Sequence, residues 1–260
     1  MITIEYRRAD GAVVASARHE DEALLCVRGV YGEGDAIVIT AGPGARLWVQ
    51  MDAALLPGEV CLPEGRMTWR IPWGEHRLAY SPAAFAGDRH VVSARAMRAE
   101  EIAARRNLAR NPADLRGDTD FFPHCTANVE TRGESVFAAR NVIDGCRHNI
   151  SHGEWPYQSW GIGAREDASC LLDFGREVEV DEMALTLRAD FPHDAYWVRG
   201  QVALSDGQTV DFPLEKTGDR QFIALGMHRV RWMRLQNMIK SDDPSAFPSL
   251  IEWEVFGRDI

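Results

Sequence analysis

The segment "LLDFGREVEVDEMAL", residues 171–185, decides the fold class of this sequence. It joins two runs of strand-forming residues, "SCLLDFG" (169–175) and "EVEVDEMALTLR" (177–188), which follow each other directly. Valine, leucine and phenylalanine dominate both runs, and such residues are typical of β-strands. We therefore expect strands here.

Strand signals continue to the end of the chain. "YWVRGQVALSDGQTVDFPL" (196–214) has the pattern of a hairpin that turns through Ser205-Asp206-Gly207. "QFIALGMHRVRWMRLQNM" (221–238) and "LIEWEVFG" (250–257) predict two further strands. The second half of the chain therefore reads as all-β.

Four segments of this half resemble, in order, the discoidin or coagulation-factor type C domains. "SVFAARNVIDG" (135–145) resembles their "A-x-N-A-I-D-G" opening, and residues 171–185 resemble their "I-x-V-D-L-G" strand and the strand after it. "HRVRWMRLQ" (228–236) resembles a later "A-R-Y-V-R-L" strand, and "SLIEWEVFG" (249–257) resembles the closing "I-S-E-I-E-V-Y-G". The resemblance covers residues 119–260 and implies an eight-stranded antiparallel jelly roll, the galactose-binding-like sandwich.

The resemblance does not identify one class of ligand. Many relatives are carbohydrate-binding modules, and others bind lipid or protein, so the fold does not fix the ligand. In the carbohydrate-binding relatives a structural Ca²⁺ lies by the "I-D-G" loop, and the resemblance places Asp144 and Glu252 at its carboxylate ligands. The chain departs from the relatives at "CRHNIS" (146–151). The alternative is that Asp144 only caps a tight turn before Gly145.

The first half has no motif of comparable specificity. Short strand signals separated by glycine and proline occur at 36–41, 46–52 and 90–97, and "EVCLPEGRMTWRIP" (59–72) predicts two strands around a turn at residues 63–65. Strands at this close spacing are typical of an antiparallel sandwich. We expect an N-terminal β-sandwich domain over residues 1–97.

Between the halves, "RAEEIAARRNLARNPADL" (98–115) has helix formers throughout, with acids early and arginines late. Asn111-Pro112 is expected to stop the helix. We therefore predict a helical connector over residues 98–118. The predicted architecture is all-β: two antiparallel, jelly-roll-like β-sandwich domains joined by a short helix, the second a galactose-binding-like domain over residues 119–260.

Composition excludes some partners. The formal net charge of -10 argues against nucleic acid, which requires a basic face. No run of about eighteen apolar residues exists, so we expect no membrane span. The five cysteines are widely spaced and never form a C-x-x-C pair, which favours reduced thiols over disulfides or a cysteine-built zinc site. With no secretory signal recognised at the start, we expect a cytoplasmic, bacterial protein.

The loop "CRHNISHGEWPYQSWG" (146–161) is the first candidate ligand site. Relatives bind ligands with loops at one end of the sandwich, and sugars need flat aromatic rings beside fixed polar groups. The candidate residues here are His152, Glu154, Trp155 and Tyr157. Trp160 is instead expected to be a buried core anchor, because large aromatic residues are mostly buried.

Three further segments add candidates for the same site. "FFPHCTANVETRGES" (121–135) supplies His124, Glu130 and Arg132, "RADFPHDAYW" (188–197) supplies Arg188, Asp190 and His193, and the loop 240–249 supplies Phe247. Arg188 suits a ligand carboxylate, and the alternative is an ion pair with Asp190 or Asp194 that braces its loop. A segment rich in aromatic and polar residues, 71–90, reads as a second site or as part of the interface between domains.

Three functions follow from these residues. The first is a carbohydrate-binding protein that recognises a saccharide with the loops of its C-terminal sandwich. The second is a glycan-active enzyme, a hydrolase or lyase, that uses carboxylates and histidines of the same loops. The third is a protein-interaction module, which would present an exposed apolar patch. The sequence gives no catalytic signature motif and leaves the oligomeric state open.

Overall fold

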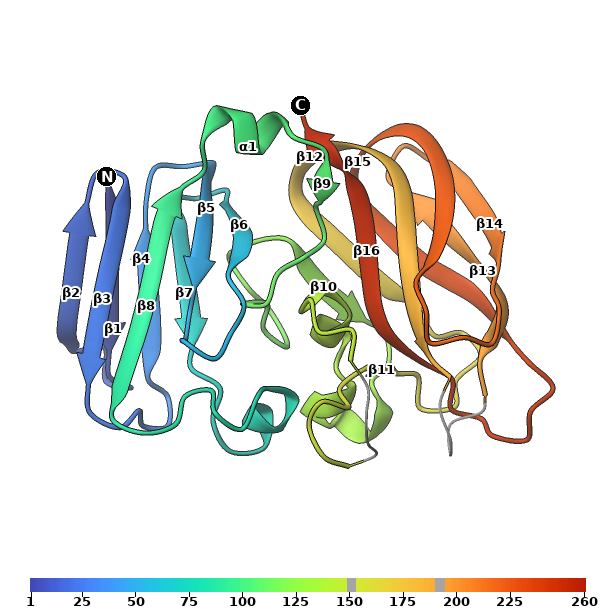
Figure 1. Cartoon of the computed structure of the whole chain (residues 1–260), viewed down its shortest axis with the longest axis horizontal. Coiled ribbons are helices and arrows are strands. Elements are labelled where there is room, and N and C mark those ends of the chain that lie inside the picture. Colours follow the sequence, from blue (N-terminus) through green and yellow to red (C-terminus); the bar gives the residue numbers. More distant parts are fainter. Residues whose placement is uncertain (149–152, 190–194) are drawn as a thin grey trace.

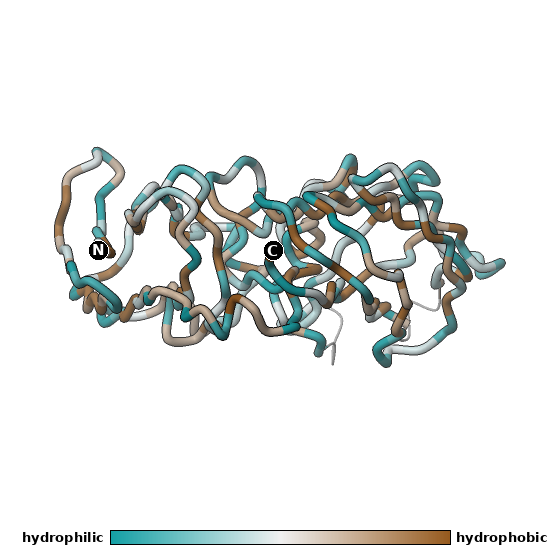
Figure 2. Tube along the Cα trace, turned by 90° about the horizontal axis from the view of Figure 1, so that it is seen from above, coloured by the Kyte–Doolittle hydropathy of each residue, from teal (hydrophilic) through white to brown (hydrophobic). Residues whose placement is uncertain are grey.

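The computed structural model describes residues 1–148, 153–189 and 195–260. Its two halves lie side by side along the longest axis, the N terminus at one end and the C terminus near the middle, on the boundary between the halves (Figures 1 and 2). Each half has its own cluster of buried apolar side chains. The predicted all-β, antiparallel class is confirmed, because every strand pairing in the described residues is antiparallel.

The first half contains two four-stranded sheets packed on one core. One sheet has the order β2 (Val13–His19), β1 (Ile2–Arg7), β4 (Ala36–Thr40) and β7 (Arg66–Arg70). The other has the order β3 (Glu22–Arg28), β8 (Arg89–Ala96), β5 (Ala45–Gln50) and β6 (Gly58–Leu62). Buried and exposed residues alternate along β1 and β3, so each strand turns one face to the core. The predicted turn at residues 63–65 joins β6 to β7, which belong to different sheets.

The second half contains one eight-stranded sheet. Its central path runs β11 (Trp160–Gly161), β16 (Ser249–Asp259), β12 (Cys170–Arg188), β15 (Gln221–Lys240), β13 (Trp197–Leu204) and β14 (Thr209–Pro213). β10 (His124–Ala127) pairs with β12, and β9 (Arg106–Asn107) pairs with β16. The long strands bend, and the sheet curves around its core (Figure 1). The antiparallel pairing and the β13–β14 hairpin are as predicted, but one of the eight strands, β9, lies outside residues 119–260, in the segment predicted as helix.

The strands predicted at 169–175 and 177–188 form one strand, β12. Its register shifts between Asp173 and Val178, on either side of Gly175. Gly175 has φ +65°, and an added Cβ would lie 2.3 Å from the ring of Phe122. Glycine is therefore required where the strand bends and Phe122 packs against it.

The predicted helical connector is mostly wrong. The helix α1 spans only Ala99–Ala103, and the chain then extends so that β9 joins the eight-stranded sheet. The physical reason is tertiary: strand pairing and buried ion pairs at Arg106 outweigh the helix propensity of the segment. Further along, Ala113 and Phe121 pack into the core of the first half.

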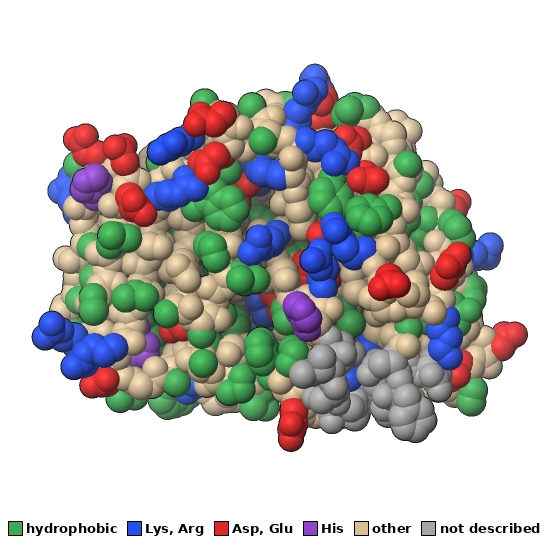
Figure 3. Space-filling view, viewed as in Figure 1, with side chains coloured by type: hydrophobic (Ala, Val, Ile, Leu, Met, Phe, Trp, Pro, Cys, Tyr) green, Lys and Arg blue, Asp and Glu red, His purple; other side chains and the backbone are tan. Residues whose placement is uncertain are grey.

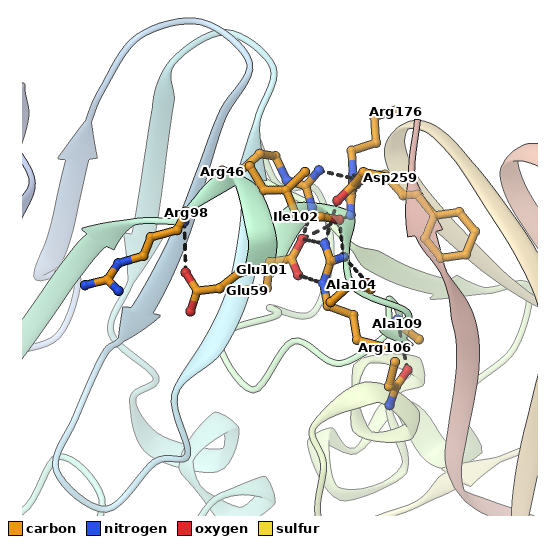
Figure 4. Close-up of polar contacts among 12 residues, drawn as sticks. Arg46, Glu59, Arg98, Glu101, Ile102, Ala104, Arg106, Ala109, Arg176 and Asp259 are labelled. Atoms are coloured by element: carbon orange, nitrogen blue, oxygen red, sulfur yellow. Dashed lines mark hydrogen bonds and ion pairs between the residues drawn. The ribbon is translucent and has the colours of Figure 1, made fainter.

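A buried ionic cluster joins the two halves beside β9 (Figure 4). Arg106 pairs with Glu59 of β6 through its Nε at 2.7 Å and with Asp259 of β16 through its Nη2 at 2.5 Å. Arg46 of β5 and Arg176 of β12 each pair with the same two acids. Because the five side chains come from four strands and the connector, they hold the halves together at this point.

The remaining helical turns are short. They are η1 (Gly74–Ala79) in the first half and η2 (Thr131–Gly133), η3 (Ser135–Phe137) and η4 (Ala139–Ile143) in the second. No helix of the described ranges has the length and apolar character needed to cross a membrane. All five cysteines are described and none forms a disulfide, as predicted.

Candidate functional site

A cleft of about 290 Å³ opens between the two halves, at the loop predicted as the ligand site. One wall comes from the first half, from Leu55, Leu56, Tyr80 and Ser81. The other wall comes from the second half and consists of Arg140, Asp144, Gly145, Cys146, His148, Trp155 and Gln158, with Pro112 of the connector beside them. The C-terminal loops alone therefore do not form the cleft.

Arg140 of η4 is a fixed part of this cleft. Its side chain is 3% exposed, and its Nε donates to the carbonyl of Asp114 at 2.8 Å. The guanidinium also lies over the ring of Tyr80, 4.6 Å from the ring centroid. A buried cation with several acceptors and an aromatic face keeps one orientation, so it is a preorganised donor group at the cleft.

Asp144 closes the turn that follows η4. Its Oδ1 accepts the N–H of Cys146 at 2.7 Å, and its Oδ2 accepts a hydrogen bond from Gln158 Nε2 at 3.2 Å. This confirms that Asp144 caps a tight turn before Gly145, whose φ is +81°. Burial raises the pKa of Asp144 to about 6, although Arg140 and the two hydrogen bonds act in the opposite direction.

Glu252 of β16 contacts the same turn from behind. The N–H of Gly145 donates to both carboxylate oxygens of Glu252 at 3.2 Å. Burial raises the pKa of Glu252 well above its usual range, and the charges of Asp144 and Glu254 raise it further. Two buried acids at one turn are hard oxygen donors of the kind that Ca²⁺ prefers.

The two predicted Ca²⁺ ligands are oxygen donors that hydrogen-bond one turn, and the Ca²⁺ site itself stays a prediction. In the ranges described, no group of three or more His, Cys, Asp or Glu side chains gathers as a metal site. Since Ca²⁺ takes six to eight oxygens, backbone carbonyls or waters would have to supply the others beside Asp144 and Glu252.

Trp155 gives the cleft an aromatic surface. Its side chain lines the cleft and is 37% exposed, which is unusual for so large an apolar group. Gln158 is buried and places its amide in the same wall. Trp160 is fully buried, stacks on Trp197 with ring centroids 6.3 Å apart, and donates to the carbonyl of Val129, so the expected core role is confirmed.

Tyr157 and Arg188 lie behind the loop and do not line the cleft. The ring of Tyr157 packs edge-on against Phe137, and its carbonyl accepts a hydrogen bond from Arg188 Nη1 at 2.9 Å. Arg188 is buried at the end of β12 and so holds the loop in place. Its proposed ion-pair partners Asp190 and Asp194 lie outside the described residues.

The candidates of residues 121–135 have structural partners away from the cleft. His124 of β10 is buried, and its Nδ1 lies 2.7 Å from Oδ1 of Asp114. Burial lowers the pKa of His124, but the Asp114 carboxylate more than offsets this, so the pKa lies above its ordinary value. Glu130 pairs with Arg116 at 2.7 Å, and Arg132 pairs with Glu134 at 2.6 Å.

Of the remaining candidates, Glu154 and Phe247 are exposed and do not line the cleft. His152, Asp190 and His193 lie outside the described residues. The predicted site residues that the structure brings together are therefore Asp144, Glu252 and Trp155.

Sequence reasoning missed the part of the site supplied by distant segments. Tyr80 belongs to the segment 71–90, for which the sequence predicts a second site or part of an interface, and it lines the cleft from the first half. Leu55 and Leu56 carry no signal that would separate them from ordinary loop residues. One sequence pattern could have identified Arg140. It is a lone charge among apolar residues in "VFAARNVI" (136–143), a pattern typical of a buried, paired cation.

No protein-family model matches this chain, and no curated protein matches it. Several solved structures are similar to it. A chitosan-binding module from a chitosanase/glucanase of Paenibacillus sp. IK-5 is 18% identical, covers 58% of this chain and 99% of its own, and has a TM-score of 0.41. The family 32 carbohydrate-binding module of NanJ from C. perfringens, solved with galactose, is 15% identical, covers 51% of this chain and 91% of its own, and has a TM-score of 0.39.

The lectin domain of lectinolysin, solved with Lewis B antigen, is 18% identical. It covers 60% of this chain and 98% of its own, with a TM-score of 0.43. The chain's own strands show that it is an all-β protein. Its resemblance to the discoidin-type domains rests on the four sequence segments and on the eight-stranded sheet that contains three of them.

Proposed function

We propose that this protein binds carbohydrate in the cleft between its halves. The observation that carries the proposal is the half-exposed indole of Trp155 beside buried polar groups of fixed orientation, Arg140, Asp144 and Gln158. A sugar ring presents an apolar C–H face and a rim of hydroxyl groups. The indole suits the first, and the guanidinium, carboxylate and amide suit the second.

The size of the cleft supports the same proposal. Small-molecule sites have volumes from about 300 Å³ upward, and the cleft of about 290 Å³ is close to that lower limit. It is suited to one or two sugar rings. The resemblance of the C-terminal half to a family with many carbohydrate-binding members agrees with this chemistry.

Binding without turnover is favoured over glycoside hydrolysis. Hydrolysis normally needs two carboxyl groups on either side of the scissile bond. Among the described residues that line the cleft, Asp144 is the one acid, and hydrogen bonds from Cys146 and Gln158 hold it in a turn. Glu130 is paired with Arg116, outside the cleft.

The test is a panel of immobilised neutral mono- and oligosaccharides, followed by calorimetry with the best binders. We expect saturable binding, and we expect Trp155→Ala to weaken it by about tenfold or more, because the sugar loses its stacking surface. Phe222→Ala is the matched control, since Phe222 is an exposed aromatic residue of β15 that does not line the cleft. Circular dichroism checks that each variant folds.

Two outcomes would contradict the proposal. One is an absence of binding across the whole panel. The other is binding that survives the double substitution His152→Ala and Trp155→Ala at full strength, which would place the saccharide elsewhere.

A further inference from the structure

A second, larger cleft of about 820 Å³ lies on the other side of Tyr80 and Arg140. One wall is the segment from the end of β7 through η1, with Arg70, Trp73 and His76. The opposite wall is the segment 115–120 of the connector. Trp73 is 38% exposed, so this cleft also has an indole open to solvent.

The two clefts meet at one place. Ala79, Tyr80 and Arg140 line both of them. The Tyr80 ring and the Arg140 guanidinium are both buried and stacked on each other, so the ridge between the clefts is fixed. The two clefts therefore adjoin at the boundary of the two halves, with Trp155 in the smaller and Trp73 in the larger.

The walls of the larger cleft are held together across the boundary. Glu75 of η1 accepts the N–H of Ser135 at 2.6 Å, and its carbonyl accepts the Ser135 hydroxyl at 2.8 Å. Trp69 Nε1 donates to the carbonyl of Ala113 at 2.8 Å. A groove whose walls are already fixed binds with little ordering cost.

The charges of the larger cleft are balanced. Three arginines line it, and so do three carboxylates, Glu33, Asp118 and Asp120. An anionic or cationic ligand would meet as much repulsion as attraction there, whereas hydroxyl groups can both donate to carboxylates and accept from guanidinium groups. The Thr119 hydroxyl, also in the lining, is buried and has no hydrogen-bond partner in the described part of the chain.

We infer that the two clefts form one groove for an extended, neutral oligosaccharide, and that Trp73 provides a second stacking platform supplied by the N-terminal half. This inference rests on the proposed carbohydrate binding in the Trp155 cleft. It assigns the first half of the chain a direct part in ligand recognition. The groove favours the interior or a long end of a linear glycan over a single terminal sugar.

The test is calorimetric titration with three neutral linear series: β-1,4-linked glucose, β-1,4-linked N-acetylglucosamine and β-1,4-linked galactose oligomers of two to six units. In at least one series we expect the hexamer to bind about tenfold tighter than the dimer, because it reaches the second platform. Trp73→Ala should lower the affinity for the hexamer to that for the dimer. Trp73→Phe, which keeps a ring, should retain most of the gain.

The matched control is Leu78→Ala, because Leu78 is an exposed apolar residue of η1 that does not line the groove. Equal affinity for dimer and hexamer in every series, or a length gain that Trp73→Ala leaves intact, overturns the inference and leaves the proposed function standing. Binding of short glycans on the panel without binding of any linear series also overturns the inference and leaves the proposed function standing. An absence of binding to every glycan overturns both.

Discussion

The side chains of Asp144 and Glu252 both accept hydrogen bonds from one turn, Asp144 from the N–H of Cys146 and Glu252 from the N–H of Gly145. Both carboxyl groups are buried, and each raises the cost of ionising the other. A divalent cation between them would remove that repulsion. We propose that the two acids are ligands of a structural Ca²⁺, with the remaining oxygens from backbone or water.

Calcium should therefore stabilise the folded protein. We expect millimolar CaCl₂ to raise the midpoint of thermal unfolding by about 5 °C or more relative to EDTA, because a ligand that binds only the native state stabilises it. Glu252→Gln should lose this difference, since one carboxylate ligand is removed. Differential scanning fluorimetry measures the shift.

Asp167→Asn serves as the control for this experiment, because Asp167 is an exposed acid paired with Arg165 and, among the described residues, makes no hydrogen bond or ion pair with the turn at 144–146. It should keep the full calcium effect. Identical unfolding curves of the unsubstituted protein in CaCl₂ and EDTA would rule out the calcium site.

At the scale of elements, the connector shows how neighbouring residues acquire different roles. Arg105 pairs with Asp181 and Glu182 on the surface, where acidic and basic side chains are interspersed over the visible face (Figure 3). Arg106, one residue later, points into the ionic cluster and contacts Glu59 and Asp259. Arg105 precedes β9 and Arg106 begins it, and the two side chains have different partners.

The two arginines should differ in their effect on stability. We expect Arg106→Ala to lower the free energy of unfolding by about 2–4 kcal/mol, because it leaves two buried carboxylates short of a partner. Arg105→Ala should cost less than about 1 kcal/mol, since exposed ion pairs are screened by solvent. Urea unfolding followed by tryptophan fluorescence gives both values, and equal losses would show that the cluster contributes no more than a surface pair.

At the scale of the whole molecule, the ionic cluster and the groove lie on the same boundary between the halves. Asp259, like Glu59, contacts all three arginines of the cluster, Arg46, Arg106 and Arg176. Burial alone would raise the pKa of Asp259, but hydrogen bonds and charge from Arg46 and Arg176 lower it well below its usual range. The stability of the contact between the two halves is therefore expected to depend on pH.

The sign of this linkage predicts acid sensitivity. A carboxyl group with a depressed folded-state pKa stabilises the protein above its unfolded pKa of about 3.9, and that contribution is lost as pH falls toward the folded value. We expect the urea midpoint to fall between about pH 5 and pH 3. Asp259→Asn should be less stable at neutral pH and show a smaller fall over that window; an unchanged slope would exclude Asp259 as a source of the dependence.

Much of the fold could be predicted because its signals are local. Runs of strand formers bounded by glycine and proline marked β4, β5 and β12–β16, and the turn at Ser205-Asp206-Gly207 marked the β13–β14 hairpin. The prediction of a helix over 98–115 was wrong although the segment is rich in helix formers. The segment instead pairs with β16 and with the acids of the cluster, which lie far away in sequence. Predicted domain boundaries at 97 and 119 stay predictions.

The site could be predicted only in part for the same reason. Trp155 was identified because its loop, 146–161, is unusual in composition, and Asp144 because its turn resembles the "I-D-G" loop of the discoidin-type domains. Tyr80 and Trp73 come from the other half of the chain, and no spacing in the sequence relates them to Arg140.

Local patterns in the sequence were enough to predict the all-β class and the strands β12–β16, because each depends on residues close together along the chain. The tertiary structure alone decided that the cleft has one wall from each half, that Arg140 stacks on Tyr80, and that Arg106 leaves the helix for the ionic cluster. These features depend on which distant surfaces pack together. Packing is a collective result of burial and ion pairing over the whole chain, and no local pattern encodes it.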